Sequence, residues 1–117
     1  MTHRLLILAL ASLFATPVLA GDPAAGAEIA KKVCAACHGA DGNSSISPEF
    51  PKLAGQHEDY LLQALSQYKS GARKNPIMAA QVQPLSEADM RNLAAYFATQ
   101  DGSLYLIKET RLLRAAK

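Results

Sequence analysis

The sequence predicts an all-α protein of three to four helices, and three observations support that fold class. Apolar residues recur at the i, i+3, i+4, i+7 spacing of a helix face in more than one segment. Residues that favour helix starts, and glycines that favour helix ends, bracket those segments. No segment shows convincing alternation of apolar and polar residues, the pattern that marks a half-buried strand.

The first twenty residues are expected to be absent from the working protein. A short basic start precedes an apolar run over 5–14, and Val18-Leu19-Ala20 supplies small residues at the −3 and −1 positions of a cleavage site. We therefore interpret 1–20 as a cleaved secretory signal peptide. A membrane anchor is disfavoured because Pro17 interrupts the apolar stretch, which falls short of the roughly 18 residues of a spanning helix. The mature protein is expected in the periplasm, without a transmembrane segment.

The first helix is expected at about 23–38. Asp22 is a favourable N-cap, Pro23 suits the first helical position, and Gly39 offers a C-terminal stop. Residues 39–55 follow as a long loop, because they combine glycine, proline, asparagine and serine without periodicity.

The second helix is expected from about 57 to 70. It has one apolar face at helical spacing, and Gly71 ends the pattern. The face consists of Leu61, Ala64, Leu65 and Tyr68. Residues 72–85 are predicted to be another loop, since they carry Asn75-Pro76 and Pro84.

The third helix is expected from about 86 to 100. Ser86 and Asp89 have the spacing of a capping box, and Met90 begins an apolar stripe at helical spacing. Gly102 closes this segment.

Charge divides the mature chain into two parts. Residues 21–102 carry a net charge of −2, whereas 103–117 carry +3. We therefore predict a domain over 21–102 and a basic C-terminal extension of unknown role over 103–117. No basic face with interleaved aromatic residues is present, so nucleic acid is not an expected partner. The domain is small enough that side chains alone would form a marginal core.

The pentapeptide Cys34-Ala35-Ala36-Cys37-His38 carries the chemistry of the sequence. Near the end of a helix, cysteines three apart lie on one face, and the following histidine projects from the same side. One planar ligand can therefore meet all three side chains. This is the geometry for two thioether bonds to haem vinyl groups, with the imidazole beneath the iron.

Three other interpretations of these cysteines are disfavoured. A thioredoxin-like dithiol needs a βαβ setting, which the sequence lacks. A zinc site needs four ligands, and beyond carboxylates the mature chain offers only Cys34, Cys37, His38 and His57. A disulfide across two residues within a helix would be strained.

With these residues in view, the sequence resembles the class I c-type cytochromes over about 22–100. It is most similar to small bacterial periplasmic monohaem proteins and to single domains of tandem dihaem ones. The resemblance implies the compact three-to-four-helix class I cytochrome c fold, wrapped around one covalent haem c. The matching segments, in chain order, are 34–39, 41–43, 48–56, 68–71, 75–78 and 93–97.

Three side chains of the mature chain could complete the coordination of the iron opposite His38: Met78, Met90 and His57. Met90 lies on a helical stripe, which favours a core role, and His57 more often would be a surface or capping residue. Met78 lies in a predicted loop, where it could fill a gap in the core. Its place in the sequence matches the ligand loop of the family, so the resemblance favours Met78 as the axial ligand.

The resemblance also implies supporting roles. A ligating histidine normally donates its second ring N–H to a carbonyl, and the family places that acceptor at Pro48. Pro48 could equally be a simple loop stiffener. Gly26, with Tyr96 and Phe97, matches the place where the first and last helices of the family cross, and a small residue against an aromatic one permits close approach.

The expected axial ligands, His38 and Met78, predict what the protein does. A thioether opposite an imidazole raises the reduction potential and leaves no open iron position for oxygen or peroxide, so an electron carrier is expected and an enzyme is not. The resemblance implies electron transfer in a periplasmic respiratory chain. Expected partners are a quinol-oxidising complex or dehydrogenase as donor and a terminal oxidase or reductase as acceptor, with the carrier itself a monomer. The alternatives are a haem subunit docked stably to a larger redox enzyme, and a haem enzyme or ligand sensor with an open iron.

Overall fold

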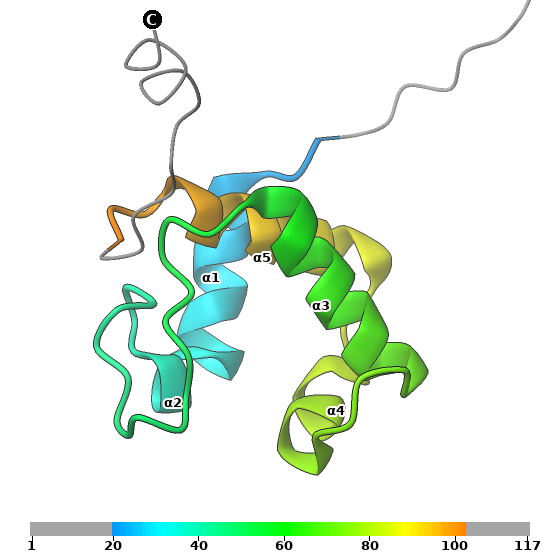
Figure 1. Cartoon of the computed structure of the whole chain (residues 1–117). Helices are drawn as coiled ribbons and strands as arrows, with labels where there is room; N and C mark the ends of the chain where they lie inside the picture. The colour runs from blue at the N-terminus through cyan, green and yellow to red at the C-terminus, as the bar shows by residue number, and fades with distance from the viewer. Residues whose placement is uncertain (1–19, 103–117) are drawn as a thin grey trace, which may run out of the picture.

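The computed structural model describes residues 20–102, and within this range the chain forms five helices and no strand. The predicted all-α class is confirmed for this part of the chain. Residues 1–19 of the predicted signal peptide and the whole basic extension, 103–117, lie outside the described residues. The helices are α1 Pro23–Val33, α2 Ala35–His38, α3 Glu58–Ser70, α4 Pro76–Val82 and α5 Glu87–Thr99 (Figure 1).

Helix α1 begins as predicted, because the Asp22 side chain accepts a hydrogen bond of 2.9 Å from the backbone N–H of Ala24 and Pro23 takes the first position. The predicted helix does not run unbroken to His38. It divides at Cys34, where the N–H of Cys37 donates to the Cys34 carbonyl at 3.2 Å across a tighter, three-residue turn. Helix α2 therefore starts as a separate short helix.

Helices α3 and α5 lie close to their predicted bounds. Gly71 ends α3 in the left-handed conformation, with a φ of 77° that a glycine adopts without steric cost. The capping box of α5 is present, since the Asp89 N–H donates to the Ser86 hydroxyl at 3.1 Å and the Ser86 N–H donates back to the Asp89 carboxylate at 2.8 Å.

The prediction that 72–85 is a loop is wrong, because this segment contains α4. Asn75 caps α4, accepting hydrogen bonds from the N–H groups of Ile77 and Met78, and Pro76 takes the first helical position. Asn75-Pro76 is thus a helix start of the same kind as Asp22-Pro23.

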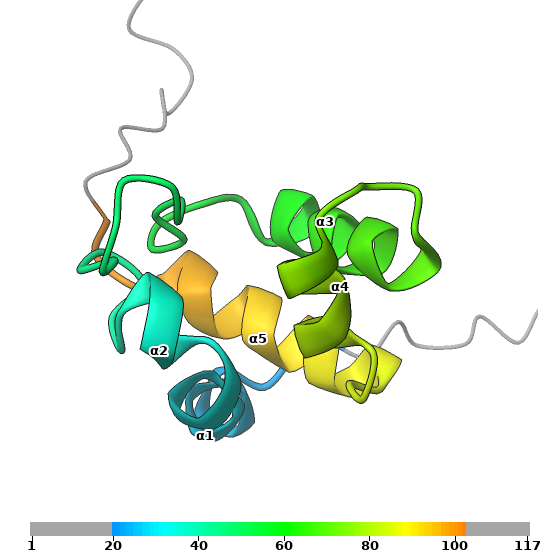
Figure 2. The ribbon, with the colours of Figure 1, turned by 90° about the horizontal axis from the view of Figure 1, so that it is seen from below.

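Helix α5 is the centre of the fold. It packs against α1 on one side and α3 on another, while α2 follows α1 and α4 packs against α3. Figures 1 and 2 show α2 and α4 at opposite sides of the molecule, with α5 running between them. Within the described range, no helix combines the length and the apolar character needed to cross a membrane.

The crossing of α1 and α5 is close, as predicted at Gly26 and Tyr96. A Cβ atom at Gly26 would lie 2.8 Å from the Tyr96 Cβ and would collide with the Asn92 carbonyl oxygen. The core next to this crossing contains Leu93, which is fully buried, and Met90, which is 4% exposed. Met90 is therefore a core residue, in agreement with the helical stripe seen in the sequence.

Candidate functional site

A cavity of about 750 Å³ opens among α2, α3, α4 and α5. Its volume lies within the range of about 300–1,000 Å³ that is usual for small-molecule and cofactor sites. Most of its lining is apolar. The lining side chains come from α2, α3, α4 and α5, from Val33 at the end of α1, and from the segment 49–53. The apolar lining includes Leu53, Leu61, Leu65, Val82, Leu85, Leu93 and Phe97.

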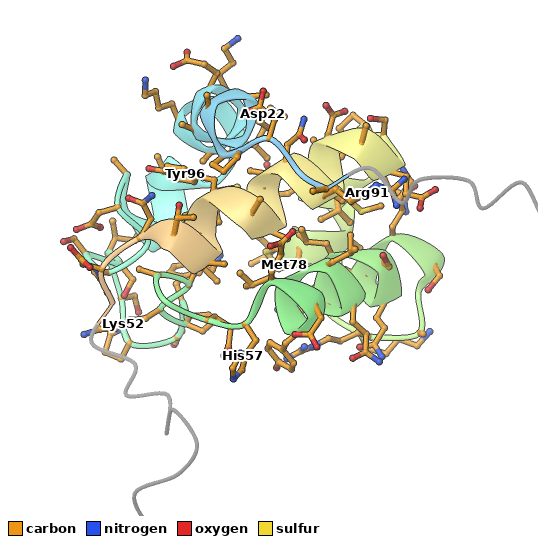
Figure 3. The ribbon with its side chains drawn as sticks, turned by 90° about the horizontal axis from the view of Figure 1, so that it is seen from above. Asp22, Lys52, His57, Met78, Arg91 and Tyr96 are labelled. Carbon is orange, nitrogen blue, oxygen red and sulfur yellow. The ribbon has the colours of Figure 1, made fainter. Side chains whose placement is uncertain are left out.

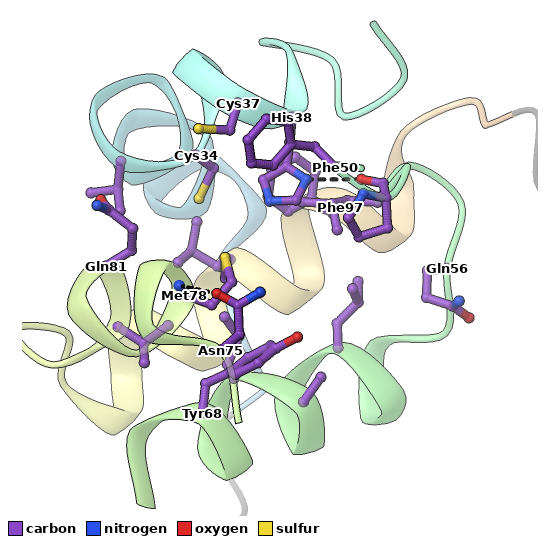
Figure 4. Close-up of a pocket in the computed structure, with 18 of the residues that line it drawn as sticks. Cys34, Cys37, His38, Phe50, Gln56, Tyr68, Asn75, Met78, Gln81 and Phe97 are labelled. Carbon is purple, nitrogen blue, oxygen red and sulfur yellow. Dashed lines mark hydrogen bonds between the residues drawn. The ribbon is translucent and has the colours of Figure 1, made fainter. Parts of the chain in front are cut away.

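The two cysteines and the histidine of the pentapeptide line one side of this cavity. Cys34 and Cys37 are free, half-buried thiols, and both point into the same space as the His38 ring (Figure 4). The disulfide considered from the sequence is therefore not formed. Among residues 20–102 no group of three or more His, Cys, Asp or Glu side chains could hold a metal ion, so the zinc alternative gains no support.

His38 is held so that one ring nitrogen faces the cavity without a partner. The residue is 5% exposed, and its ring Nδ1 lies 2.8 Å from the Pro51 carbonyl oxygen. A carbonyl only accepts hydrogen bonds, so Nδ1 carries the proton and Nε2 of the neutral ring has a free lone pair. Within the described residues, Nε2 is the buried side-chain nitrogen or oxygen atom that lacks a hydrogen-bond partner. An unpaired buried acceptor is costly, so this atom is suited to a metal.

The carbonyl that receives the His38 proton belongs to Pro51, and the expectation of Pro48 is corrected. Pro48 is exposed, because the turn closed by the 3.1 Å hydrogen bond from the Phe50 N–H to the Ser47 carbonyl carries it to the surface. The chain then returns to His38, where the Phe50 ring meets the imidazole edge-on with centroids 6.0 Å apart. No sequence signal identifies Pro51, because the acceptor is a main-chain atom that every residue type has.

Met78 lies across the cavity from the pentapeptide, on the first turn of α4 (Figure 4). It is half-buried and packs against the edge of the core. Of the three candidates for the second axial ligand, it alone lines the cavity. Met90 belongs to the core of α5, and His57 is exposed at the start of α3, where Figure 3 shows it pointing outward.

Polar side chains that the sequence analysis did not single out lie along the α3–α4 side of the cavity. The Arg73 guanidinium lies 5.0 Å from the centroid of the Tyr68 ring and donates a hydrogen bond of 3.4 Å to the Tyr60 hydroxyl. That hydrogen bond is the largest cause of a raised pKa at Arg73, whose charge is thus favoured further. The fragment 68–71 matched the family resemblance, but nothing in it indicated this contact.

Burial changes the chemistry of Cys34. Burial, first, and the nearby Cys37 thiol together raise the pKa of the Cys34 thiol to about 11. The free thiol is therefore protonated at neutral pH, as expected for a cysteine next to an apolar cavity.

These residues fit a covalent haem. The cavity is apolar, as the macrocycle requires, and two thiols one turn apart face it from one side. An imidazole lone pair and a thioether come from opposite sides. These are donor types that c-type cytochromes use for haem iron.

Comparison with known proteins agrees with this fit. Residues 23–101 match the family model described as Cytochrome c. The chain is 51% identical over 85 residues to cytochrome c4 of Pseudomonas aeruginosa, covering 73% of this chain and 41% of that protein. It is 40% identical to cytochrome c-554(548) of Halomonas halodenitrificans, covering 70% of this chain and all of that protein.

Comparison with solved structures supports the class I cytochrome c fold. The crystal structure of reduced cytochrome c4 from Pseudomonas stutzeri is similar with a TM-score of 0.67 and 47% identity, covering 73% of this chain and 48% of that one. The thiosulfate dehydrogenase TsdBA of Marichromatium purpuratum is similar with a TM-score of 0.63 and 25% identity, covering 68% of this chain and 19% of that one. The match thus spans only about half the length of the cytochrome c4 proteins.

Proposed function

Because the chain belongs to the cytochrome c family and has the class I fold, we propose that it is an electron-transfer protein that carries single electrons on one covalent haem c. When bound, the haem supplies an iron that alternates between its ferrous and ferric states. The task of the protein is to attach the group, to orient it, to tune it and to exclude other ligands.

Attachment falls to Cys34 and Cys37. Their sulfur atoms would add to the two vinyl groups to form thioether bonds, which would attach the haem to the segment that carries both cysteines. The thiols suit this role because both are free and both line the cavity. Covalent attachment also secures a large apolar group inside a domain whose own core is small.

His38 would bind the iron through Nε2, and this atom is the observation on which the proposal rests. It is buried, unpaired and aimed into the cavity, and its lone pair is available because Nδ1 donates to Pro51. The hydrogen bond to Pro51 fixes the tautomer and the ring orientation, and it makes Nε2 a more basic ligand.

Met78, which lines the cavity across from the pentapeptide, would be the second protein ligand of the iron. A thioether opposite an imidazole raises the reduction potential and closes the iron to oxygen and peroxide. This favours an electron carrier over an enzyme. We also propose that 1–20 direct export to the periplasm, and that the carrier is a monomer. Its partners would then be a quinol-oxidising complex or dehydrogenase on one side and a terminal oxidase or reductase on the other.

A second candidate function is a haem subunit docked stably to a larger redox enzyme. It is favoured by two similarities: the chain is 42% identical over 65 residues to a thiosulfate dehydrogenase electron acceptor of Thiomonas intermedia, and it shares its fold with part of TsdBA. Gel filtration of a membrane-free extract of the native cells distinguishes a free carrier from a docked subunit. A free carrier elutes at the mass of one chain, whereas a docked subunit co-elutes with its enzyme.

The test of the proposed ligand set compares Met78→Ala with Met90→Ala in exported holoprotein. Met78→Ala should abolish the weak red absorption band of the sulfur–iron bond in the oxidised protein, lower the midpoint potential and admit external ligands. Met90→Ala should leave the band in place and reduce stability by about 2–5 kcal/mol, the usual cost of truncating a buried side chain. The assignment is wrong if the band disappears in Met90→Ala and persists in Met78→Ala.

A further inference from the structure

Helix α4, which carries Met78, is too short to be stable by itself. It has seven residues, whereas isolated helices shorter than about 12–15 residues are marginal in water. Its conformation must therefore come from its two ends and from the helix it packs against, α3 (Figure 2).

The start of α4 is fixed by its own cap. The Asn75 side-chain oxygen accepts hydrogen bonds of 3.0 Å from the Ile77 N–H and 3.1 Å from the Met78 N–H. The cap thus holds the backbone of Met78 itself. It does not tie α4 to another helix, because all these groups belong to the same turn.

The end of α4 is tied to α3 by a reciprocal pair of side chains. The Lys69 ammonium donates hydrogen bonds to the main-chain carbonyls of Gln83, at 3.1 Å, and of Leu85. In return, the Gln83 side-chain amide donates to the Lys69 carbonyl at 3.0 Å. Each side chain satisfies carbonyls at the end of the other helix, where such groups lack helical partners. The positive charge of Lys69 is also favourable at the C-terminus of α4.

Burial along α4 is uneven. Val82, at the end next to the Lys69–Gln83 pair, is 1% exposed, whereas Ile77, beside Met78, is 55% exposed. Met78 is half-buried and contacts the core, but the turn that carries it is less buried than the far end of the helix, so its place relative to the cavity also depends on how firmly that far end is held. Once both of its ends are held, α4 moves as one rigid element, so the contacts at Gln83 also restrict the position of Met78.

We propose that Lys69 and Gln83 are positioning residues for Met78: by clasping α4 to α3 they hold the thioether at the iron. The inference rests on the proposed function, since it requires that Met78 is the sixth ligand. Loss of the hydrogen bonds between Lys69 and Gln83 increases the fraction of molecules in which α4 has moved away from the cavity. In those molecules Met78 no longer occupies the iron, and an external ligand can bind. The apparent affinity for an external ligand rises with that fraction.

The experiment titrates oxidised, full-length holoprotein with imidazole and follows the loss of the sulfur–iron band. Lys69→Leu should bind imidazole about tenfold more tightly than wild type, because it loses hydrogen bonds from a charged group, and Gln83→Leu about fivefold more tightly, because it loses one neutral hydrogen bond. Lys69→Arg, which can still donate to both carbonyls, should restore affinity toward the wild-type value. Lys74→Leu is the matched control, because it removes the same charge from an exposed side chain in the segment that joins α3 to α4.

Two variants keep the test decisive. Hydrogen bonds from Ser86, and to a smaller extent the charge of Lys69, lower the pKa of Asp89 at the start of α5, so Lys69→Leu perturbs a second site, whereas Gln83→Leu leaves all charges in place. If Gln83→Leu lowers the melting temperature but leaves imidazole affinity at the value of Lys74→Leu, the pair is merely structural and the inference is overturned. Failure of the proposed function would look different, because Met78→Ala would then leave the band intact.

Discussion

The two ring nitrogens of His38 have different surroundings, and the difference comes from the loop that follows the pentapeptide. Nδ1 donates to a main-chain carbonyl, that of Pro51, so the ring orientation depends on the path of the loop and not on another side chain. The loop is itself anchored, since the Leu53 N–H donates to the Gly42 carbonyl at 2.8 Å. The tautomer of His38 is thereby set by backbone geometry, which side-chain substitutions nearby change little.

The two cysteines give the first residue-scale prediction. Replacing Cys34 and Cys37 together with serine should abolish haem that survives denaturation, because a hydroxyl forms no thioether with a vinyl group. Each single replacement should retain one covalent bond. Haem staining after a denaturing gel, together with the mass of the intact protein, measures this. Covalent haem in the double variant would contradict the assignment of both cysteines.

At the scale of helices, local sequence signals predicted much of what the structure shows. Asp22-Pro23, Gly71 and the Ser86–Asp89 box each act through hydrogen bonds or dihedral angles within a few residues, so they could be recognised without knowing the fold. Helix α4 was missed although Asn75-Pro76 is the same kind of signal. Its seven residues span about two turns, too few for an apolar periodicity to emerge.

The hydrogen-bond acceptor of His38 was wrongly expected at Pro48, because no local sequence signal identifies that acceptor. Pro48 and Pro51 stand in the same loop, and which carbonyl reaches His38 depends on how 39–55 folds back against α2 and α5. That path is set by long-range contacts, such as the 3.0 Å hydrogen bond from the Tyr96 hydroxyl to the Ala40 carbonyl. The pentapeptide could therefore be recognised from spacing, whereas its main-chain partner required the tertiary structure.

The α1–α5 crossing gives a prediction on packing. Gly26→Ala should destabilise the protein by about 1–3 kcal/mol, the usual cost of overpacking, because the new methyl group meets the Asn92 carbonyl and the Tyr96 Cβ. Ala25→Gly, one position away at a half-buried site of α1, is the control and should cost only about 1 kcal/mol of helix propensity. Urea unfolding of the holoprotein measures both. Equal losses would mean that the close approach at Gly26 is not needed.

The start of α5 gives a prediction on pH. Hydrogen bonds from the Ser86 side chain, first, and from its backbone N–H lower the pKa of Asp89 below its ordinary value of 3.8. A carboxylate with a lowered folded-state pKa stabilises the protein above its unfolded-state pKa, and this contribution is lost as the pH falls through the folded-state pKa. Asp89→Asn should therefore be less stable than wild type at neutral pH, and the gap should close as the medium becomes strongly acidic.

Urea unfolding at several pH values tests this, with Glu58→Gln as the matched variant. Glu58 is an exposed carboxylate in the first turn of α3, where His57 makes no side-chain cap. Ser86→Ala should cost about 1 kcal/mol at neutral pH, as expected for loss of an N-cap. If Glu58→Gln and Asp89→Asn show the same pH dependence, the effect comes from the helix dipole and not from the capping box.

At the scale of the whole molecule, the proposed ligands come from two different parts of the fold. Cys34, Cys37 and His38 belong to the α1–α2 side and Met78 to the α3–α4 side, while α5 packs against both α1 and α3 (Figures 1 and 2). A bound haem would thus join the two sides through covalent and axial bonds. The reduction potential would then depend on their relative position, which α5 maintains.

The described structure also bears on where the domain ends. Gly102 lies against Ala54, since a Cβ at Gly102 would collide with the Ala54 carbonyl, and the Asn43 side chain donates to the Asp101 carbonyl at 2.7 Å. Residues up to Gly102 therefore pack against the loop that positions His38. The predicted boundary at 102 stays a prediction, because 103–117 lie outside the described residues.

The last prediction concerns that boundary and the charges on its two sides. Residues 21–102 carry −2 and 103–117 carry +3, so the extension should be attracted to the domain or to an acidic partner surface. Truncation after Gly102 should keep covalent haem and the sulfur–iron band, but it should reduce stability or weaken partner binding in a way that added salt diminishes. The full-length chain with Arg111, Arg114 and Lys117 replaced by glutamine separates charge from length, because it should reproduce the salt-dependent part alone. Loss of the band on truncation would mean that the extension belongs to the haem site and that the domain continues beyond Gly102.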